Sequence, residues 1–133
     1  MNYKAFLTEY WHPKGTCISK FFHEKALSYL HDSNEILTVQ DWIEHFKTTA
    51  VDEKGELSEN ACDWHTTVDR IADLGNDNYM TITFHRSANW NGFVTSIFTI
   101  KDGLIAELHE YYSPCDDNIV PQWRTDLKDA ERI

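Results

Sequence analysis

The chain of 133 residues lacks the features that mark several large classes of protein. Its three cysteines, Cys17, Cys62 and Cys115, form neither a CxxC pair nor a cysteine–histidine set spaced for zinc. An odd number of unpaired cysteines indicates free thiols in a reducing compartment. No apolar run approaches the ~20 residues of a membrane span, and the N-terminus has no apolar core long enough for a signal peptide. We therefore expect a cytoplasmic protein that does not enter a membrane.

Positive charge and nucleotide-binding motifs are also scarce. The chain has 12 basic against 22 acidic residues, which gives a net charge of −10 with histidine neutral. This balance opposes binding to nucleic acid or to an anionic membrane surface. The patterns GxGxxG, GxxxxGK(S/T), GxSxG and HExxH are all missing from the sequence. We therefore predict no nucleotide site, no serine-esterase site, no metal site and no cofactor.

Aromatic residues, by contrast, are abundant, with 5 Trp, 6 Tyr and 7 Phe. Residues 2–11 place aromatic and apolar side chains three and four positions apart, which predicts an amphipathic helix that Pro13 ends. Residues 25–34 predict a strand followed by a turn. Thr38 is then the predicted N-cap of a second amphipathic helix, which carries Trp42. The first half of the chain is therefore mainly helical.

The second half is rich in Thr, Ile, Val, Phe and Tyr, which favour strands. Four such runs follow one another, separated by turn residues: 63–74, 78–87, 92–101 and 104–112. Asp102-Gly103, between the last two runs, is a strong hairpin signal. Helices followed by an antiparallel meander predict an α+β class, with a curved antiparallel sheet closing on the helices. We expect residues 1–133 to form a single domain around one ligand-sized pocket.

The last hairpin predicts which face of the sheet is enclosed. A three-residue loop at 101–103 would place the more apolar set of side chains on one face: Val94, Phe98, Ile100, Leu104, Ala106, Leu108, Glu110 and Tyr112. A two-residue turn would shift the pairing by one. If the first pairing holds, Glu110 is a buried carboxyl, whose pKa tends to rise into the range of general acid or base catalysis. The alternative is that Glu110 lies at the sheet rim and meets Arg86, Arg70 or water.

Two strings of the sequence resemble a known superfamily. FTIKDGLIAELHEYY (residues 98–112) resembles the closing hairpin of the nuclear transport factor 2-like superfamily, especially its SnoaL-like branch. ISKFFHEKALSYLHDS (residues 18–33) resembles the short second helix of that group and the strand that follows it. The resemblance rests on the order and spacing of elements over nearly the whole chain. It implies a cone-shaped roll with a pocket at its open end, and a homodimer formed through the sheet.

The superfamily includes ketosteroid isomerase, limonene epoxide hydrolase, scytalone dehydratase, polyketide cyclases and non-catalytic binding proteins. The resemblance implies that Glu110 corresponds to the last-strand carboxylate of the hydrolase and the cyclases. Asp32, or its neighbour His31, lies near the position of the isomerase base, and only one of the two can enter the pocket if both lie in a strand. Tyr10 and Tyr3 are candidates for the helix-one oxyanion donor of the isomerase.

Two functions are compatible with this sequence. The first is a cofactor-free isomerase, cyclase, dehydratase or hydrolase, in which Glu110 and His31 or Asp32 exchange protons with a small hydrophobic or aromatic substrate and His85 pairs with Glu110 or donates a hydrogen bond. Residues 81–85 carry no Arg-x-Asp pair, which counts against epoxide hydrolysis. The second is a non-catalytic binding or dimeric assembly domain. The predicted ligand-binding residues are Tyr10, Trp11, Tyr29, Trp42, Phe84, Phe98, Leu108 and Tyr112.

Overall fold

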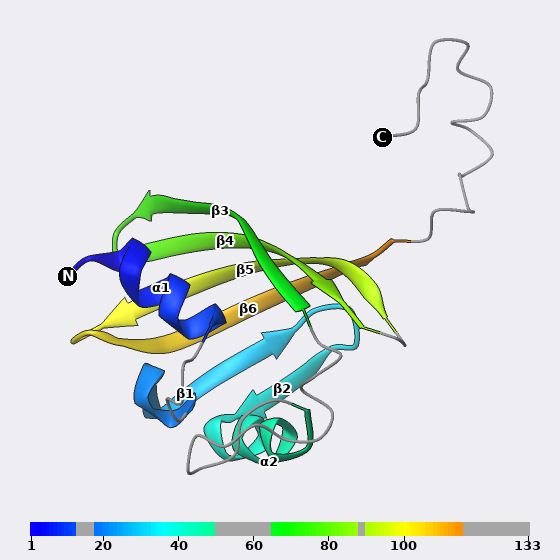
Figure 1. The fold of residues 1–133 in the computed structure, drawn as a ribbon. Coiled ribbons are helices and arrows are strands. Elements are labelled where there is room, and N and C mark those ends of the chain that lie inside the picture. Colours follow the sequence, from blue (N-terminus) through cyan, green and yellow to red (C-terminus); the bar gives the residue numbers. More distant parts are fainter. Residues whose placement is uncertain (13–17, 50–64, 88–89, 116–133) are drawn as a thin grey trace, which may run out of the picture.

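The computed structural model describes residues 1–12, 18–49, 65–87 and 90–115 (Figure 1). In chain order the elements are α1 (Tyr3–Trp11), the short 3-10 helix η1 (Ile18–Phe21), β1 (Phe22–Leu30), β2 (Glu35–Thr38), α2 (Val39–Thr49), β3 (His65–Gly75), β4 (Asn78–Arg86), β5 (Asn91–Lys101) and β6 (Leu104–Pro114). Both predicted helices and all four β-rich runs are present. The α+β class with a curved sheet and N-terminal helices is therefore confirmed, whereas β2 was not predicted.

The six strands form one sheet in the order β2-β1-β6-β5-β4-β3, which bends strongly along its length (Figure 1). β3 to β6 form the predicted antiparallel meander. β1 pairs antiparallel with β2 but parallel with β6. The sheet is therefore mixed rather than wholly antiparallel, because the direction of β6 is fixed by its hairpin with β5 and not by β1.

The hairpin between β5 and β6 differs from the predicted one in two ways that cancel. Its turn has two residues, Asp102 and Gly103, at φ +51° and +79°, and Lys101 faces Leu104 across it. Thr99 then faces Glu107 while Ile100 faces Ile105, so that Ala106 is an extra residue, a β-bulge. Ile105 therefore takes the inward position that the sequence analysis gave to Leu104 and Ala106, whereas the residues from Leu108 onward face as predicted.

Both helices pack against the same face of the sheet, which we call the inner face; the opposite side is the outer face. The core on the inner face is apolar and aromatic: Leu7, Tyr10, Phe21, Phe22, Ala26, Val39, Trp42, Phe98, Ile100, Ile105 and Leu108. Trp42 of α2 donates its indole N–H to Ser28 Oγ at 2.7 Å. The predicted cap of α2 is confirmed, since Thr38 Oγ1 accepts from Asp41 N–H at 3.2 Å and Asp41 Oδ2 accepts from Thr38 N–H at 2.8 Å.

Candidate active site

A group of buried polar side chains lies on the inner face beside the apolar core. Glu110 of β6 is 3% exposed. Its register partner Ser96 on β5 donates a hydrogen bond to Oε2 at 3.1 Å, and Tyr112 donates its hydroxyl to Oε1 at 2.7 Å. The alternative in which Glu110 sits at the rim beside an arginine therefore does not hold. Both carboxyl oxygens are held by neutral donors, and no residue in the described ranges gives the ionised form a balancing cation.

Burial sets the proton affinities in this group. It raises the pKa of Glu110, which the hydrogen bonds from Tyr112 and Ser96 partly oppose and the charge of Asp32 reinforces. Burial, followed by the charge of Glu110, also raises the pKa of Tyr10 and of Tyr112. The arrangement therefore combines a carboxylate that is more basic than usual with two tyrosines that keep their protons.

Tyr10 differs from its neighbours in having no hydrogen bond of its own. Its ring lies in the core, in edge contacts with Phe22 and Phe98 at centroid distances of 5.8 and 5.4 Å, and only 6% of the residue is exposed. Within the part of the chain that the structure describes, its hydroxyl has no hydrogen-bond partner. A buried hydroxyl without a partner costs about 1–3 kcal/mol. A bound ligand with an oxygen atom would remove this penalty.

His85 of β4 forms a second polar centre on the inner face. Its Nε2 lies 2.7 Å from Thr83 Oγ1 and its Nδ1 lies 3.1 Å from Thr66 Oγ1. The indole of Trp11, whose N–H donates to Thr81 Oγ1 at 3.0 Å, meets the imidazole edge-on at 5.4 Å. Burial lowers the pKa of His85 to about 4. His85 is therefore neutral at pH 7, and its pairing with Glu110, which the sequence suggested, is replaced by hydroxyl contacts.

We expect His85 to make the protein sensitive to acid. Its pKa of about 4 in the folded chain lies below the ordinary 6.5, so the unfolded chain binds more protons between these values. The free energy of unfolding should therefore decrease as the pH falls from 6.5 to 4, by at most about 3 kcal/mol from this group. Urea unfolding of the unaltered protein and of His85→Gln across this range measures the slope. Equal slopes would contradict the expectation, and the exposed His65→Gln serves as the control.

The structure brings most of the predicted site residues to the inner face but not all of them. Those on or against the inner face are Glu110, His85, Tyr10, Trp11, Trp42, Phe98, Leu108 and Tyr112. Three others lie on the outer face, where Tyr29 and His31 contact His109 and Phe84 contacts Phe93. The reason is alternation along a strand, since Tyr29 follows the buried Ser28 and Phe84 precedes the buried His85.

Asp32 occupies an intermediate position. It is exposed in the turn that follows β1, yet its charge is near enough to raise the pKa of Glu110. The backbone N–H of its neighbour His31 donates to the carbonyl of Glu110 at 3.0 Å, which fixes this turn against β6. Of the two candidate partners of Glu110, Asp32 is therefore the one whose charge acts on it, although no contact joins the two side chains.

Sequence reasoning missed the hydroxyl groups of the inner face. Thr81, Thr83 and Ser96 are fully buried, whereas the more apolar Ile82 and Phe84 are only half-buried on the outer face. The usual rule, apolar side chains inward, therefore gives the wrong face for β4. Strand register could have revealed these hydroxyl groups, because register partners share a face of the sheet. Ser96 faces Glu110 across β5–β6, and Thr81 faces Ser96 across β4–β5.

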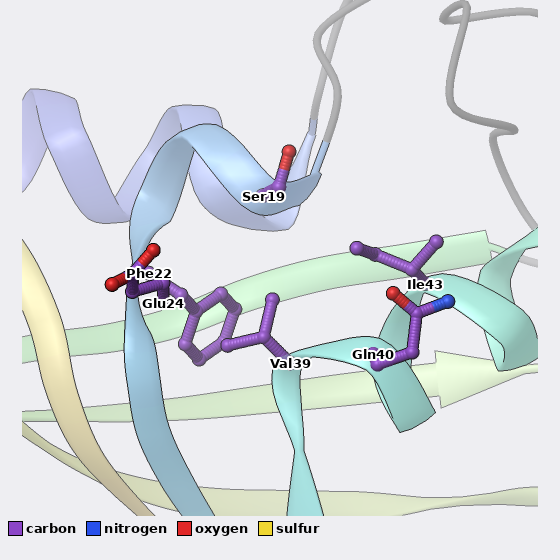
Figure 2. A pocket seen from close by; sticks show the side chains of 6 residues that line it. All are labelled: Ser19, Phe22, Glu24, Val39, Gln40 and Ile43. Atoms are coloured by element: carbon purple, nitrogen blue, oxygen red, sulfur yellow. The ribbon is translucent and has the colours of Figure 1, made fainter.

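A separate open hollow of about 300 Å³ lies between η1, β1 and α2 (Figure 2). Its lining is mixed in chemistry: Ser19, Phe22, Glu24, Val39, Gln40 and Ile43. Figure 2 shows the ring of Phe22 directed towards Val39 at its base. None of the predicted catalytic residues lines this hollow, so it is distinct from the polar group around Glu110.

Among the described residues, no group of three or more His, Cys, Asp or Glu side chains is arranged to hold a metal ion. In the same residues, no helix combines the length and the apolar character that crossing a membrane requires. Cys115 is an exposed free thiol, whereas Cys17 and Cys62 lie outside the described residues.

Comparison with known proteins supports the fold through structure rather than sequence. No family model and no curated protein matches the chain. A nuclear transport factor 2-like protein of unknown function from Burkholderia xenovorans superposes with a TM-score of 0.66 at 17% identity, covering 98% of this chain and 94% of the other. A candidate ketosteroid isomerase from Kribbella flavida gives 0.69 at 13% identity, covering 96% and 89%. A candidate SnoaL-like polyketide cyclase from a Jannaschia species gives 0.58 at 11% identity, covering 81% and 83%.

These matches define the class of structure. The chain has the nuclear transport factor 2-like fold, as its sequence strings suggested. At identities of 17% and below, the likeness concerns the fold alone, because this fold serves many unrelated functions. What the protein does must therefore be argued from its own site residues.

Proposed function

We propose that the protein is a cofactor-free enzyme in which Glu110 acts as a general base on a small hydrophobic substrate. The observation that carries this proposal is the burial of the Glu110 carboxyl between two hydroxyl donors, with no cationic partner among the residues that the structure describes. A carboxyl held for structural reasons alone is usually paired with an arginine or lysine. A buried carboxyl that meets only hydroxyl donors has the raised proton affinity that a base needs.

The proton transfer follows from the positions of the three groups. The Glu110 carboxylate takes a proton from a substrate carbon next to a carbonyl group, and the hydroxyls of Ser96 and Tyr112 keep the carboxylate in position. The substrate oxygen, on which negative charge develops, accepts a hydrogen bond from the Tyr10 hydroxyl, which has no partner among the described residues. Isomerisation, aldol-type cyclisation and dehydration all begin with this step. A substrate bearing rings would pack against Phe98 and Trp11.

A solvent-exchange experiment tests this proposal without knowledge of the natural substrate. Ring-bearing ketones and β-keto esters are incubated with the protein in D2O, and the loss of their α-proton signals is followed by NMR. We expect exchange of at least one compound above the buffer rate, and slower exchange with Tyr10→Phe. Compounds that bind and shift protein resonances but do not exchange would instead favour the non-catalytic binder.

Two further sequence predictions stay proposals. The outer faces of β4 and β5 carry half-buried aromatic and aliphatic side chains, including Phe84, Phe93 and Ile97, which suits the predicted homodimer formed through the sheet. Light scattering that gives the mass of a single chain would exclude that dimer. The cytoplasmic location remains a prediction from the cysteine content and is open to test by fractionation.

A further inference from the structure

We propose that two histidines on the outer face, His31 and His109, form a binding site for a divalent late transition metal ion. They are 78 residues apart in sequence and meet because the parallel register of β1 and β6 brings Tyr29 opposite His109. His31 Nε2 and His109 Nδ1 lie 2.8 Å apart. We call these two residues the outer histidine pair. It lies on the other side of the sheet from Glu110, and the proposal is independent of the proposed catalysis.

The Glu107 carboxylate fixes the position of one proton in the outer histidine pair. Glu107 Oε1 lies 2.7 Å from His109 Nε2, and since a carboxylate only accepts, this nitrogen carries the proton. When His109 is neutral, its Nδ1 carries a lone pair, and this lone pair accepts a hydrogen bond from His31 Nε2–H. A metal-binding histidine usually donates its second ring N–H to a carboxylate in the same way, which fixes the ring and increases its basicity.

The surroundings keep both rings in place and open to solvent. Tyr29 stacks on His109 at 4.7 Å and Tyr111 stacks on His31 at 4.6 Å, with interplanar angles of 9° and 10°. The side chain of His109 is 30% exposed and His31 is exposed. An aqueous ion can therefore reach both nitrogens without crossing the core.

The distance between the nitrogens selects the geometry of the ion. Metal–imidazole bonds are about 2.0–2.1 Å long, so two ligands at a right angle have nitrogens about 2.9 Å apart, and two at a tetrahedral angle about 3.4 Å apart. The 2.8 Å hydrogen bond already holds the nitrogens near the right-angle spacing, which favours square-planar or octahedral ions such as Ni²⁺ and Cu²⁺. The two nitrogens now point at each other across their hydrogen bond, with ring centroids 5.0 Å apart and planes at 9°, so both rings must rotate to direct their lone pairs at one ion. The proton of His31 moves from Nε2 to Nδ1, and water fills the remaining positions.

Calorimetric titration of the full-length protein with Ni²⁺ tests this site, because Ni²⁺ has the required geometry and does not oxidise the cysteines. We expect one ion per chain, with a dissociation constant that rises at least tenfold in His109→Asn and in His31→Asn. Glu107→Gln, which only supports His109, should weaken binding by about 10–100-fold. His65→Asn changes an exposed histidine on β3 and should leave the affinity unchanged.

The outcome is decisive in either direction. Circular dichroism first establishes that each variant is folded. His31→Asn changes an exposed turn residue, so it should not disturb the core. Broadening of the His31 and His109 ring signals by Ni²⁺ would support the proposal. Binding that is unchanged in both variants, or that falls equally in His65→Asn, would overturn it, as would the lack of any heat of binding.

Discussion

Replacing Glu110 by glutamine is expected to slow the proposed proton exchange by about 10²- to 10⁴-fold while leaving the protein folded. Glutamine keeps the shape of the side chain and can still accept from the Tyr112 hydroxyl, but it cannot take up a proton. The measurement is the rate of α-proton loss in D2O for the compound that the unaltered protein exchanges fastest. Glu35→Gln, an exposed carboxyl on β2, is the matched control and should exchange at the normal rate.

The pH dependence of the same rate provides a second test of the role of Glu110. Burial raises its pKa above the ordinary 4.5, so exchange should fall on the acid side with a midpoint above that value. Tyr112→Phe removes a hydrogen bond that favours the carboxylate and should move this midpoint to higher pH. If Glu110→Gln exchanges as fast as the unaltered protein, Glu110 is not the base.

The raised pKa of Glu110 also predicts a stability cost. The folded chain binds this proton more tightly than the unfolded chain does, so the free energy of unfolding falls as the pH rises from 4.5 through the raised value. Above the raised value the full penalty is present, and below 4.5 it vanishes. This slope is opposite in sign to the one expected from His85, so the two groups can be separated by their variants.

Phe98→Ala is expected to lower the free energy of unfolding by about 3–5 kcal/mol, the largest stability effect that we predict. The side chain is fully buried, and its ring meets those of Tyr10 and Trp11 at centroid distances of 5.4 and 6.5 Å. Its removal leaves a cavity between α1 and β5, beneath the rings of Tyr10 and Trp11. Since domains are stable by only about 5–15 kcal/mol, much of the total would be lost. Urea unfolding followed by tryptophan fluorescence measures the change.

Phe93→Ala is the matched control for this experiment. Phe93 lies on the same strand but on the outer face, where it is half-buried against Phe84. Its removal should reduce stability by less than half as much, because solvent can fill the space that it leaves. Equal losses for the two variants would mean that the inner face is not the main core.

The inward direction of Glu110 could be predicted from the sequence, although the hairpin loop assumed in that prediction was one residue too long. The Asp102-Gly103 signal gave the position of the hairpin, and the predicted three-residue loop gave the correct face for Leu108, Glu110 and Tyr112. The actual turn is one residue shorter, and the bulge at Ala106 restores the lost residue. A bulge depends on how the strand bends in the complete sheet, and no local pattern in the sequence marks it.

Other features could not be predicted because they depend on contacts between distant segments. The hydrophobic pattern of β4 favours Ile82 and Phe84 as core residues, yet the sheet register directs Thr81 and Thr83 inward. His31 lies beside His109 because β1 joins β6 in parallel, a pairing that short-range patterns do not reveal. The sequence therefore predicted the type of both long helices and of every strand except β2, and the tertiary structure decided which face of each strand is enclosed.

The place of β6 in the sheet has a consequence for how the chain is made. β6 is the last strand in sequence but lies between β1 and β5, so it joins the two halves of the sheet. During synthesis, β1 cannot pair with β6 until residues 104–114 have left the ribosome. Contacts of such long separation slow folding. We infer that a nascent chain stopped before residue 104 would expose the edges of both β1 and β5 and would be prone to aggregate.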